Sequence, residues 1–284
     1  GYTGIYSVTV PGDHKLKEYT FKINSTAVCD PYGVMVKPGT TTNIVMDLDS
    51  TDPAGGWAAR PALKEREDSV IYEVHIRDFT LDSSSGVDSA KQGKFLGMVQ
   101  SGTTYTSGST TVKTGIDHLV ELGVTHVQIM PFYDFATAQY NWGYDPLNYN
   151  VPEEQYASSG ADYAARIREV KTMVNELHKR GIRVIMDVVY NHTFDSSPFA
   201  GISNRYYYTD QRKDMAGCGV ALNCSEPMVS RFIQDSMNYW VSEFQIDGFR
   251  MDLMGIFYYS CVNDWADSLN ANNPGANILL YGEP

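Results

Sequence analysis

The chain has 284 residues, of which 43% are hydrophobic, and a formal net charge of −12 at pH 7. This length fits one large domain, or a small domain with part of a larger one, and the composition is typical of a globular protein. The negative charge argues against nucleic acid or an anionic membrane surface as a partner. No run of about 18 or more apolar residues occurs, so no membrane-spanning segment is predicted, and no N-terminal signal peptide is visible.

The first third of the chain begins with short strand patterns. Residues 1–50 alternate in polarity over 4–10, 19–23 and 43–48, with turn residues between these segments. These strands are too few for a complete sandwich. Residues 51–69 contain Pro, Gly and a run of charges, and this composition predicts a linker.

From residue 70 onward strand and helix patterns alternate. Apolar strands are predicted at 70–79, 125–132, 182–189, 244–253 and 277–281, and helices at 116–122, 161–180, 225–243 and 262–269. Ser225 is the expected N-cap of the third helix, and Gly123 and Gly181 follow the first two as stop signals. The segment 82–114, rich in Ser, Thr and Gly, is predicted to be a long loop. Strand–helix alternation implies an α/β fold with a parallel sheet and right-handed crossovers.

The predicted fourth strand carries charges that a buried strand seldom holds. Arg250 and Asp252 are two residues apart, so on a strand they share one face. An arginine beside a carboxylate favours the ionised form that a nucleophile requires. A buried structural ion pair explains the run equally well, so the run alone leaves both interpretations open.

The Gly248-Phe249-Arg250-Met251-Asp252 run is one of four motifs. The others are Tyr140-Asn141-Trp142-Gly143-Tyr144-Asp145-Pro146, Asp187-Val188-Val189-Tyr190-Asn191-His192-Thr193 and Tyr281-Gly282-Glu283-Pro284. Three of them resemble, in order, conserved regions of the α-amylase-type glycoside hydrolases (glycoside hydrolase family 13). The motif at 140–146 resembles the signature of type I pullulanases, the debranching members of that family. The resemblance covers nearly the whole chain.

This resemblance implies a (β/α)8 TIM barrel of which residues 70–284 form the N-terminal part, with the first five strands present. Residues 1–50 then correspond to the last strands of a preceding β-sandwich domain that is similar to a carbohydrate-binding module. Five strands of eight would leave two apolar edges unpaired. We therefore expect the chain to be a fragment, or to receive the missing C-terminal part of the barrel from another chain.

The resemblance also assigns catalytic roles. Retaining glycoside hydrolysis needs one nucleophilic and one acidic carboxyl group on the two sides of the scissile bond. By motif match, Asp252 is the nucleophile and Glu283 the general acid/base. Arg250 is expected to hold Asp252 ionised, and Asp187 to support Arg250.

Further positions correspond to sugar-binding residues of the family. The resemblance implies that Tyr144 stacks on the sugar ring next to the cleaved bond, and that His192 and Asp145 form hydrogen bonds there. Trp142 is interpreted as a support of its loop. No cofactor is implied as a requirement. Asn191 matches an asparagine that is associated with calcium in many α-amylases, and because debranching enzymes are less consistent, calcium binding stays open.

Two features depart from the family pattern. The third catalytic carboxylate, an aspartate that follows a histidine, is expected beyond Pro284, and a site without it should lose activity by orders of magnitude. The fragment alone is therefore expected to be inactive. In addition, Phe257-Tyr258-Tyr259 stands where pullulanases usually carry His-Asp.

The sequence thus predicts a retaining hydrolase of α-1,6-glucosidic branch linkages in pullulan, starch or glycogen-derived limit dextrins. The partner is an α-glucan polysaccharide or oligosaccharide. One alternative is an α-1,4-acting amylase or neopullulanase, which the motif at 140–146 disfavours. Another is a catalytically incompetent protein that binds glucan without cleaving it.

The cysteines say little about the compartment. Four are too few for a disulfide framework in a chain of this length. Cys218 and Cys224 are near enough in sequence to bridge a loop, whereas Cys29 and Cys261 have no evident partner. A secreted or cell-surface location is favoured over a cytoplasmic one.

Overall fold

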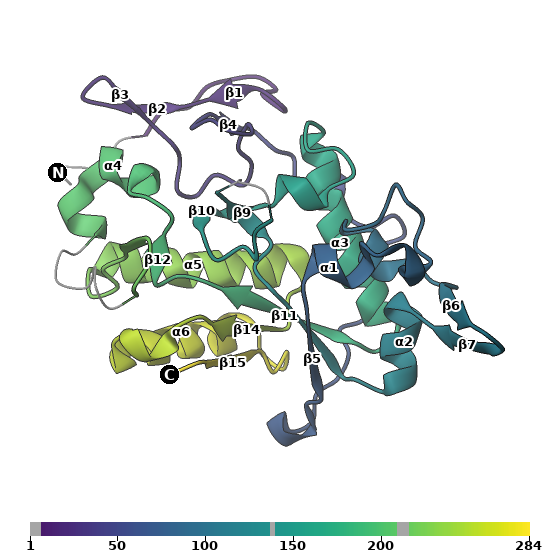
Figure 1. The fold of residues 1–284 in the computed structure, drawn as a ribbon. Helices are drawn as coiled ribbons and strands as arrows, with labels where there is room; N and C mark the ends of the chain where they lie inside the picture. Colours follow the sequence, from purple (N-terminus) through teal and green to yellow (C-terminus); the bar gives the residue numbers. More distant parts are fainter. Residues whose placement is uncertain (1–6, 137–139, 209–215) are drawn as a thin grey trace.

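The computed structural model describes residues 7–136, 140–208 and 216–284, and its centre is a sheet of five parallel strands. The strands are β5 (Ile71–Val74), β8 (His126–Ile129), β11 (Arg183–Val188), β14 (Gly248–Met251) and β15 (Leu279–Gly282). They lie side by side in chain order, with β5 at one edge and β15 at the other (Figure 1). The predicted parallel sheet of a partial (β/α)8 barrel is confirmed.

Helices return the chain between successive strands (Figure 1). They are α1 (Ile76–Thr80), α2 (Gly115–Leu122), α3 (Tyr163–Lys179), α4 (Ser197–Tyr207), α5 (Pro227–Phe244) and α6 (Tyr259–Asn272). Helix α3 shows why they form: Ile167, Val170 and Leu177 are fully buried on one stripe. Asp162 caps its first turn by accepting a hydrogen bond of 2.9 Å from the backbone N–H of Ala165.

Several predicted boundaries were wrong. The first strand ends at Val74, and α1 begins at Ile76, because Ile76 and Thr80 bury one face at helical spacing. Helix α5 begins at Pro227 with Glu226 as N-cap, so Ser225 is not the cap. The fourth strand starts only at Gly248, because α5 continues to Phe244.

The segment 82–114 was also predicted incorrectly, since it is not one long loop. It contains a hairpin of β6 (Thr104–Ser107) and β7 (Thr110–Lys113). Gly108 opens the two-residue turn with φ of 60°, a conformation that glycine adopts without strain. The hairpin projects from the edge of the molecule near α2 (Figure 1).

The N-terminal region forms two small antiparallel sheets. Strand β1 (Glu18–Tyr19) pairs with β4 (Asn43–Ile44), and β2 (Phe21–Ile23) pairs with β3 (Thr26–Val28). Of the strand predicted at 4–10, residues 7–10 are not in a strand and the rest lies outside the described residues. Met35 and Ile44 belong to the same apolar cluster as the barrel core. The division into a sandwich domain, a linker and a barrel stays a prediction.

Two further antiparallel pairs lie beyond the carboxyl ends of the central strands. Strand β9 (Tyr133–Phe135) pairs with β10 (Pro146–Pro152), and β12 (His192–Thr193) with β13 (Val220–Ala221). They shape the loops that follow β8 and β11. No helix in the described ranges has the length and apolar character needed to cross a bilayer.

Candidate active site

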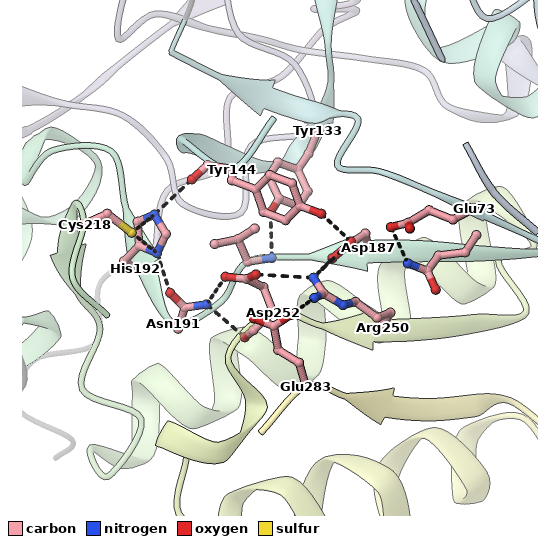
Figure 2. Close-up of polar contacts among 12 residues, drawn as sticks. Glu73, Tyr133, Tyr144, Asp187, Asn191, His192, Cys218, Arg250, Asp252 and Glu283 are labelled. Carbon is pink, nitrogen blue, oxygen red and sulfur yellow. Dashed lines mark hydrogen bonds and ion pairs between the residues drawn. The ribbon is translucent and has the colours of Figure 1, made fainter. Parts of the chain in front are cut away.

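Charged side chains from three neighbouring strands meet at the carboxyl end of the sheet (Figure 2). Asp187 lies in β11 directly beside Arg250 in β14, and Arg250 lies beside Tyr281 in β15. Asp252 and Glu283 follow the ends of β14 and β15. Because parallel strands end at the same rim, residues distant in sequence come together there.

Arg250 joins the three carboxyl groups of this cluster (Figure 2). Its Nη1 donates hydrogen bonds to Asp187 Oδ1 and Oδ2 at 2.9 and 3.1 Å, and to Asp252 Oδ1 at 3.3 Å. Its Nη2 donates to Glu283 Oε2. Burial opposes the charge of Arg250, but the carboxylate of Asp187 outweighs it and holds the pKa of Arg250 above its ordinary value. The guanidinium therefore stays charged.

Asp187 is a fully buried carboxyl group within this cluster. Its side chain is fully buried, and burial raises its pKa to about 7 against the opposing effect of Arg250. Tyr144 donates a hydrogen bond of 2.8 Å to Asp187 Oδ2. Burial and the carboxylate of Asp187 raise the pKa of Tyr144, so this hydroxyl keeps its proton.

Asn191 holds Asp252 from the side opposite to Arg250. Its Nδ2 donates to the Asp252 carbonyl and to Asp252 Oδ2, both at 2.9 Å. Its Oδ1 contacts His192 Nδ1, and His192 Nε2 lies 3.0 Å from the Tyr144 carbonyl oxygen. Burial lowers the pKa of His192. Both ring nitrogens therefore have protein partners, and a hydrogen bond from His192 to sugar stays a prediction.

The motif at 140–146 forms the loop between β9 and β10. Asn141 Nδ2 donates to Asp145 Oδ2 at 2.9 Å, so Asp145 fixes the loop, and its hydrogen bond to sugar stays a prediction. Gly143 has φ of 92°, and a side chain there would collide with the Pro131 carbonyl oxygen. The side chain of Trp142 is 54% exposed, so Trp142 is not part of the hydrophobic core.

Glu283 is placed by close backbone packing. The Glu283 N–H donates to the Met251 carbonyl, and the Gly255 N–H donates to the Glu283 carbonyl, both at 3.2 Å. A side chain at Gly282 would collide with Met254 and with the Met251 carbonyl oxygen. The loop after the fourth strand, which departs from the family pattern at Phe257, thus lies directly against Glu283.

The arrangement of acidic, histidine and cysteine side chains bears on whether a metal ion binds. Nowhere in 7–136, 140–208 and 216–284 do three His, Cys, Asp or Glu side chains converge in a way that could bind one. The amide of Asn191 is already bonded to Asp252 and His192. Calcium binding at Asn191 stays a prediction, and no step of the chemistry below uses a metal.

The cysteines differ from the pairing that their spacing suggested. Cys218 is not joined to Cys224; its Sγ lies 3.7 Å from His192 Nε2, at the exposed rim of the site. Cys261, which had no evident partner, donates from its thiol to the Cys224 carbonyl at 3.1 Å. The contact of Cys218 with His192 was missed because nothing in the local sequence signals it.

Tyr133 is a second residue that the motifs did not indicate. Its hydroxyl accepts a hydrogen bond of 2.7 Å from the Val189 N–H, just after β11 (Figure 2). This contact anchors the backbone between Asp187 and Asn191. Tyr133 lies in an apolar run outside the four motifs, so only the structure reveals its place.

The chain is similar in sequence to known proteins. Residues 109–216 match the family model "Alpha amylase, catalytic domain". The chain is 36% identical to the pullulanase of Bacillus subtilis (strain 168), over 99% of this chain and 40% of that protein. It is 35% identical to the chloroplastic isoamylase 3 of Oryza sativa subsp. japonica, over 82% of this chain and 32% of that protein. It thus spans two fifths or less of either relative.

Solved structures agree with these relatives. The pullulanase of Bacillus acidopullulyticus superposes with a TM-score of 0.88 at 41% identity, over 97% of this chain and 35% of that one. The pullulanase of Paenibacillus barengoltzii, solved in complex with maltohexaose and α-cyclodextrin, gives a TM-score of 0.83 at 40% identity, over 90% of this chain and 41% of that one.

On these comparisons the chain belongs to the α-amylase family, and its five-stranded parallel sheet is part of that family's barrel. Its relatives are pullulanases and isoamylases, the debranching enzymes of the family.

Proposed function

We propose that the protein is a retaining glycoside hydrolase that cleaves α-1,6-glucosidic linkages in branched α-glucans. One observation carries this proposal: Asp252 and Glu283, from the ends of adjacent strands, both contact the guanidinium of Arg250. Two carboxyl groups at one site are what a retaining glycosidase requires. The pullulanase and isoamylase relatives support the choice of the α-1,6 bond.

In the first step, Asp252 attacks the anomeric carbon while Glu283 transfers a proton to the leaving 6-oxygen. Water then attacks the glycosyl–enzyme ester and gives a proton to Glu283, which releases Asp252 as a carboxylate. Asn191 and Arg250 each donate a hydrogen bond to a different oxygen of Asp252, at 2.9 and 3.3 Å. These contacts orient the nucleophile before substrate arrives.

Glu283 has to leave Arg250 in order to donate its proton. Its side chain is 39% exposed, so it has room to turn toward an incoming glycosidic oxygen. Arg250 keeps its bonds to Asp187 during this movement and continues to face Asp252. The ring of Tyr144, held by Asp187, offers its face to the sugar next to the cleaved bond.

Incubation of the complete protein with pullulan tests this function, because the trisaccharide product identifies the bond that is cut. Maltotriose is the expected product of α-1,6 cleavage. Panose would reassign the protein to the α-1,4-acting amylases or neopullulanases. Pullulan that is bound and left uncut would identify a glucan-binding protein without turnover. The Asp252→Asn variant, prepared identically, is the blank.

A further inference from the structure

A hollow of about 720 Å³ is walled by segments that are distant from one another in the sequence. Its lining includes Arg77 from α1, Gln92 and Lys94 from the segment after that helix, Tyr140 from the loop between β9 and β10, and Gln155. The carboxyl groups of the catalytic cluster are not among its lining residues. The hollow is therefore a feature of the surface that the proposed reaction does not use.

Lys94 brings a positive charge to this hollow. Its side chain is half-buried, and among the described residues the recorded partner of its Nζ is a neutral group, the Gln155 carbonyl at 2.6 Å. The chain has 34 acidic residues and a net charge of −12, yet no ion pair of Lys94 is recorded in the part that the structure describes. A charge that has lost part of its water is best compensated by an opposite charge. An anion in the hollow would supply it.

Arg77 places a second cation beside Lys94. The backbone of Gly93, the residue before Lys94, packs against Arg77, since a side chain at Gly93 would lie 3.4 Å from Arg77 Cγ. Arg77 Nη1 donates to Asp78 at 3.2 Å, and Asp78 also accepts from the Tyr140 hydroxyl. One carboxylate thus stands against two cations, which leaves the hollow with a surplus of positive charge.

The acidic residues that precede Gln155 have contacts of their own. Glu153 accepts hydrogen bonds from the backbone N–H groups of Phe135 and Gln155, at 3.2 and 2.9 Å. Glu154 Oε2 lies 3.9 Å from Arg166 Nη1. These acids are therefore engaged elsewhere, and the charge of Lys94 stays available to a ligand.

Two amide side chains add neutral donors to the wall. Gln92 and Gln155 both line the hollow, and no hydrogen bond of either side-chain amide is recorded among the described residues. Each amide has two N–H donors. An ammonium group, a guanidinium group and free amides together suit an anion with several acceptor oxygens, and a phosphate group offers at least three.

We infer that Lys94, Arg77 and the amides of Gln92 and Gln155 form a binding site for a phosphate group, either as the free ion or as a small phosphate ester. The volume of the hollow lies in the range of small-molecule sites and admits both. The inference goes beyond the proposed function and does not depend on it, because no carboxyl group of the catalytic cluster takes part.

Titration calorimetry of the complete protein tests this site. The probes are inorganic phosphate and glucose 6-phosphate, with glucose as the blank for the ester. Lys94→Gln should weaken phosphate binding at least about tenfold, because it removes a charge-assisted hydrogen bond. Lys91→Gln is the matched control and should change the affinity by less than about twofold, since Lys91 is 42% exposed and already pairs with Asp88 at 3.2 Å. Added NaCl should lower the affinity of the parent, as screening of a charged ligand requires.

A charge series at Gln92 gives a second test that a loss of structure cannot imitate. Gln92 is partly exposed and has no recorded side-chain hydrogen bond among the described residues, so changing it removes no such contact of the fold. Gln92→Glu should weaken phosphate binding at least about tenfold, and Gln92→Lys should strengthen it about fivefold or more. A variant that only damages the fold would not bind more tightly than the parent.

The two probes distinguish the source of the phosphate group. Binding of inorganic phosphate alone assigns the site to the free ion, and binding of glucose 6-phosphate beyond that of glucose extends it to esters; both results support the inference if they depend on Lys94. Binding of neither probe at concentrations up to about 10 mM would refute it. Affinities that are the same in the parent, in Lys94→Gln and in both Gln92 variants would refute it as well.

Discussion

Charged clusters lie at both ends of β11 and β14: one at their amino ends, here called the base, and one at their carboxyl ends, here called the rim. The two clusters differ in how far protein groups enclose them. At the base, Asp247 Oδ2 lies 2.8 Å from His178 Nε2 and accepts a 2.6 Å bond from the Val184 N–H. Its Oδ1 accepts from Arg60 Nη1 at 2.6 Å. Burial alone would raise the pKa of Asp247, but His178 and two arginines hold it below its ordinary value.

At the rim, by contrast, burial has a larger effect on the pKa of the aspartate than the neighbouring arginine has. Asp187 is as buried as Asp247, yet its pKa is raised to about 7, because burial outweighs the effect of Arg250 and the nearby carboxylate of Asp252 adds to the rise. The base cluster is closed by protein groups, whereas Glu283 at the rim remains 39% exposed. Both clusters pair buried aspartate with arginine, so we expect the enclosed base to serve stability and the more open rim to serve ligand binding and chemistry.

Replacing Asp252, the proposed nucleophile, should give the largest effect and distinguish the rim from the base most clearly. Asp252→Asn in the complete protein should lower kcat on pullulan by about four orders of magnitude or more, because no oxygen remains that can attack and leave. The free energy of unfolding should fall by only about 1–2 kcal/mol, because the amide oxygen still accepts from one of Asn191 and Arg250 while the NH2 group faces the other donor. Steady-state rates and urea denaturation measure the two quantities. Near-parental turnover would refute the assignment of Asp252.

Replacing Asp247 at the base should mainly lower the stability of the fold. Asp247→Ala removes the acceptor of Arg60 and His178 and leaves their polar groups buried, so it should cost about 3–5 kcal/mol of stability. Thermal and urea unfolding provide the measurement. Asp88→Ala, at a largely exposed surface pair, is the control and should cost less than about 1 kcal/mol. A loss at Asp247 as small as this control would show that the base cluster does not hold the strands.

The alternation of apolar strands and amphipathic helices predicted a parallel sheet, and the family resemblance predicted that its strands are the first five of a barrel. The alternation failed where one apolar run contains two elements, as at Ile76, where a buried helix follows a strand without a break in hydrophobicity. It also failed at 82–114, because the Thr-rich strands of the hairpin are exposed on both faces and show no alternation.

For the site, motif resemblance identified Asp187, Arg250, Asp252 and Glu283, which the structure brings together. It could not give the partners of each group. The placement of Cys218 against His192 and of Tyr133 against Val189 depends on how loops from different strands fold over the rim. Such contacts join residues far apart in sequence and leave no periodic pattern.

The raised pKa of Asp187 predicts a pH dependence of stability that Asp187→Asn removes. Between its ordinary value near 4 and about 7, the folded protein holds a proton on Asp187 that the unfolded chain releases. The free energy of unfolding should therefore fall as pH rises through this window, by about 2–4 kcal/mol more in the parent than in Asp187→Asn. Burial also raises the pKa of Glu153 and Asp134, but these titrate in both proteins and cancel in the difference. Parallel curves from urea denaturation at several pH values would contradict the prediction.

The smallest expected effect comes from removing one partner of Asp247, which tests how much a single contact of the base cluster contributes to stability. Arg60→Gln removes the charged bond to Asp247 Oδ1 and the bond to the Ile246 carbonyl, while His178 and Arg183 remain beside Asp247. Because the arginine is partly exposed and the carboxylate keeps Arg183 and His178 beside it, the loss of stability should be about 1–2 kcal/mol, well below that of Asp247→Ala. Urea denaturation measures it, and kcat on pullulan should equal that of the parent. A fall in kcat without a fall in stability would mean that the base communicates with the rim, and the separation between the two ends of the strands would no longer hold.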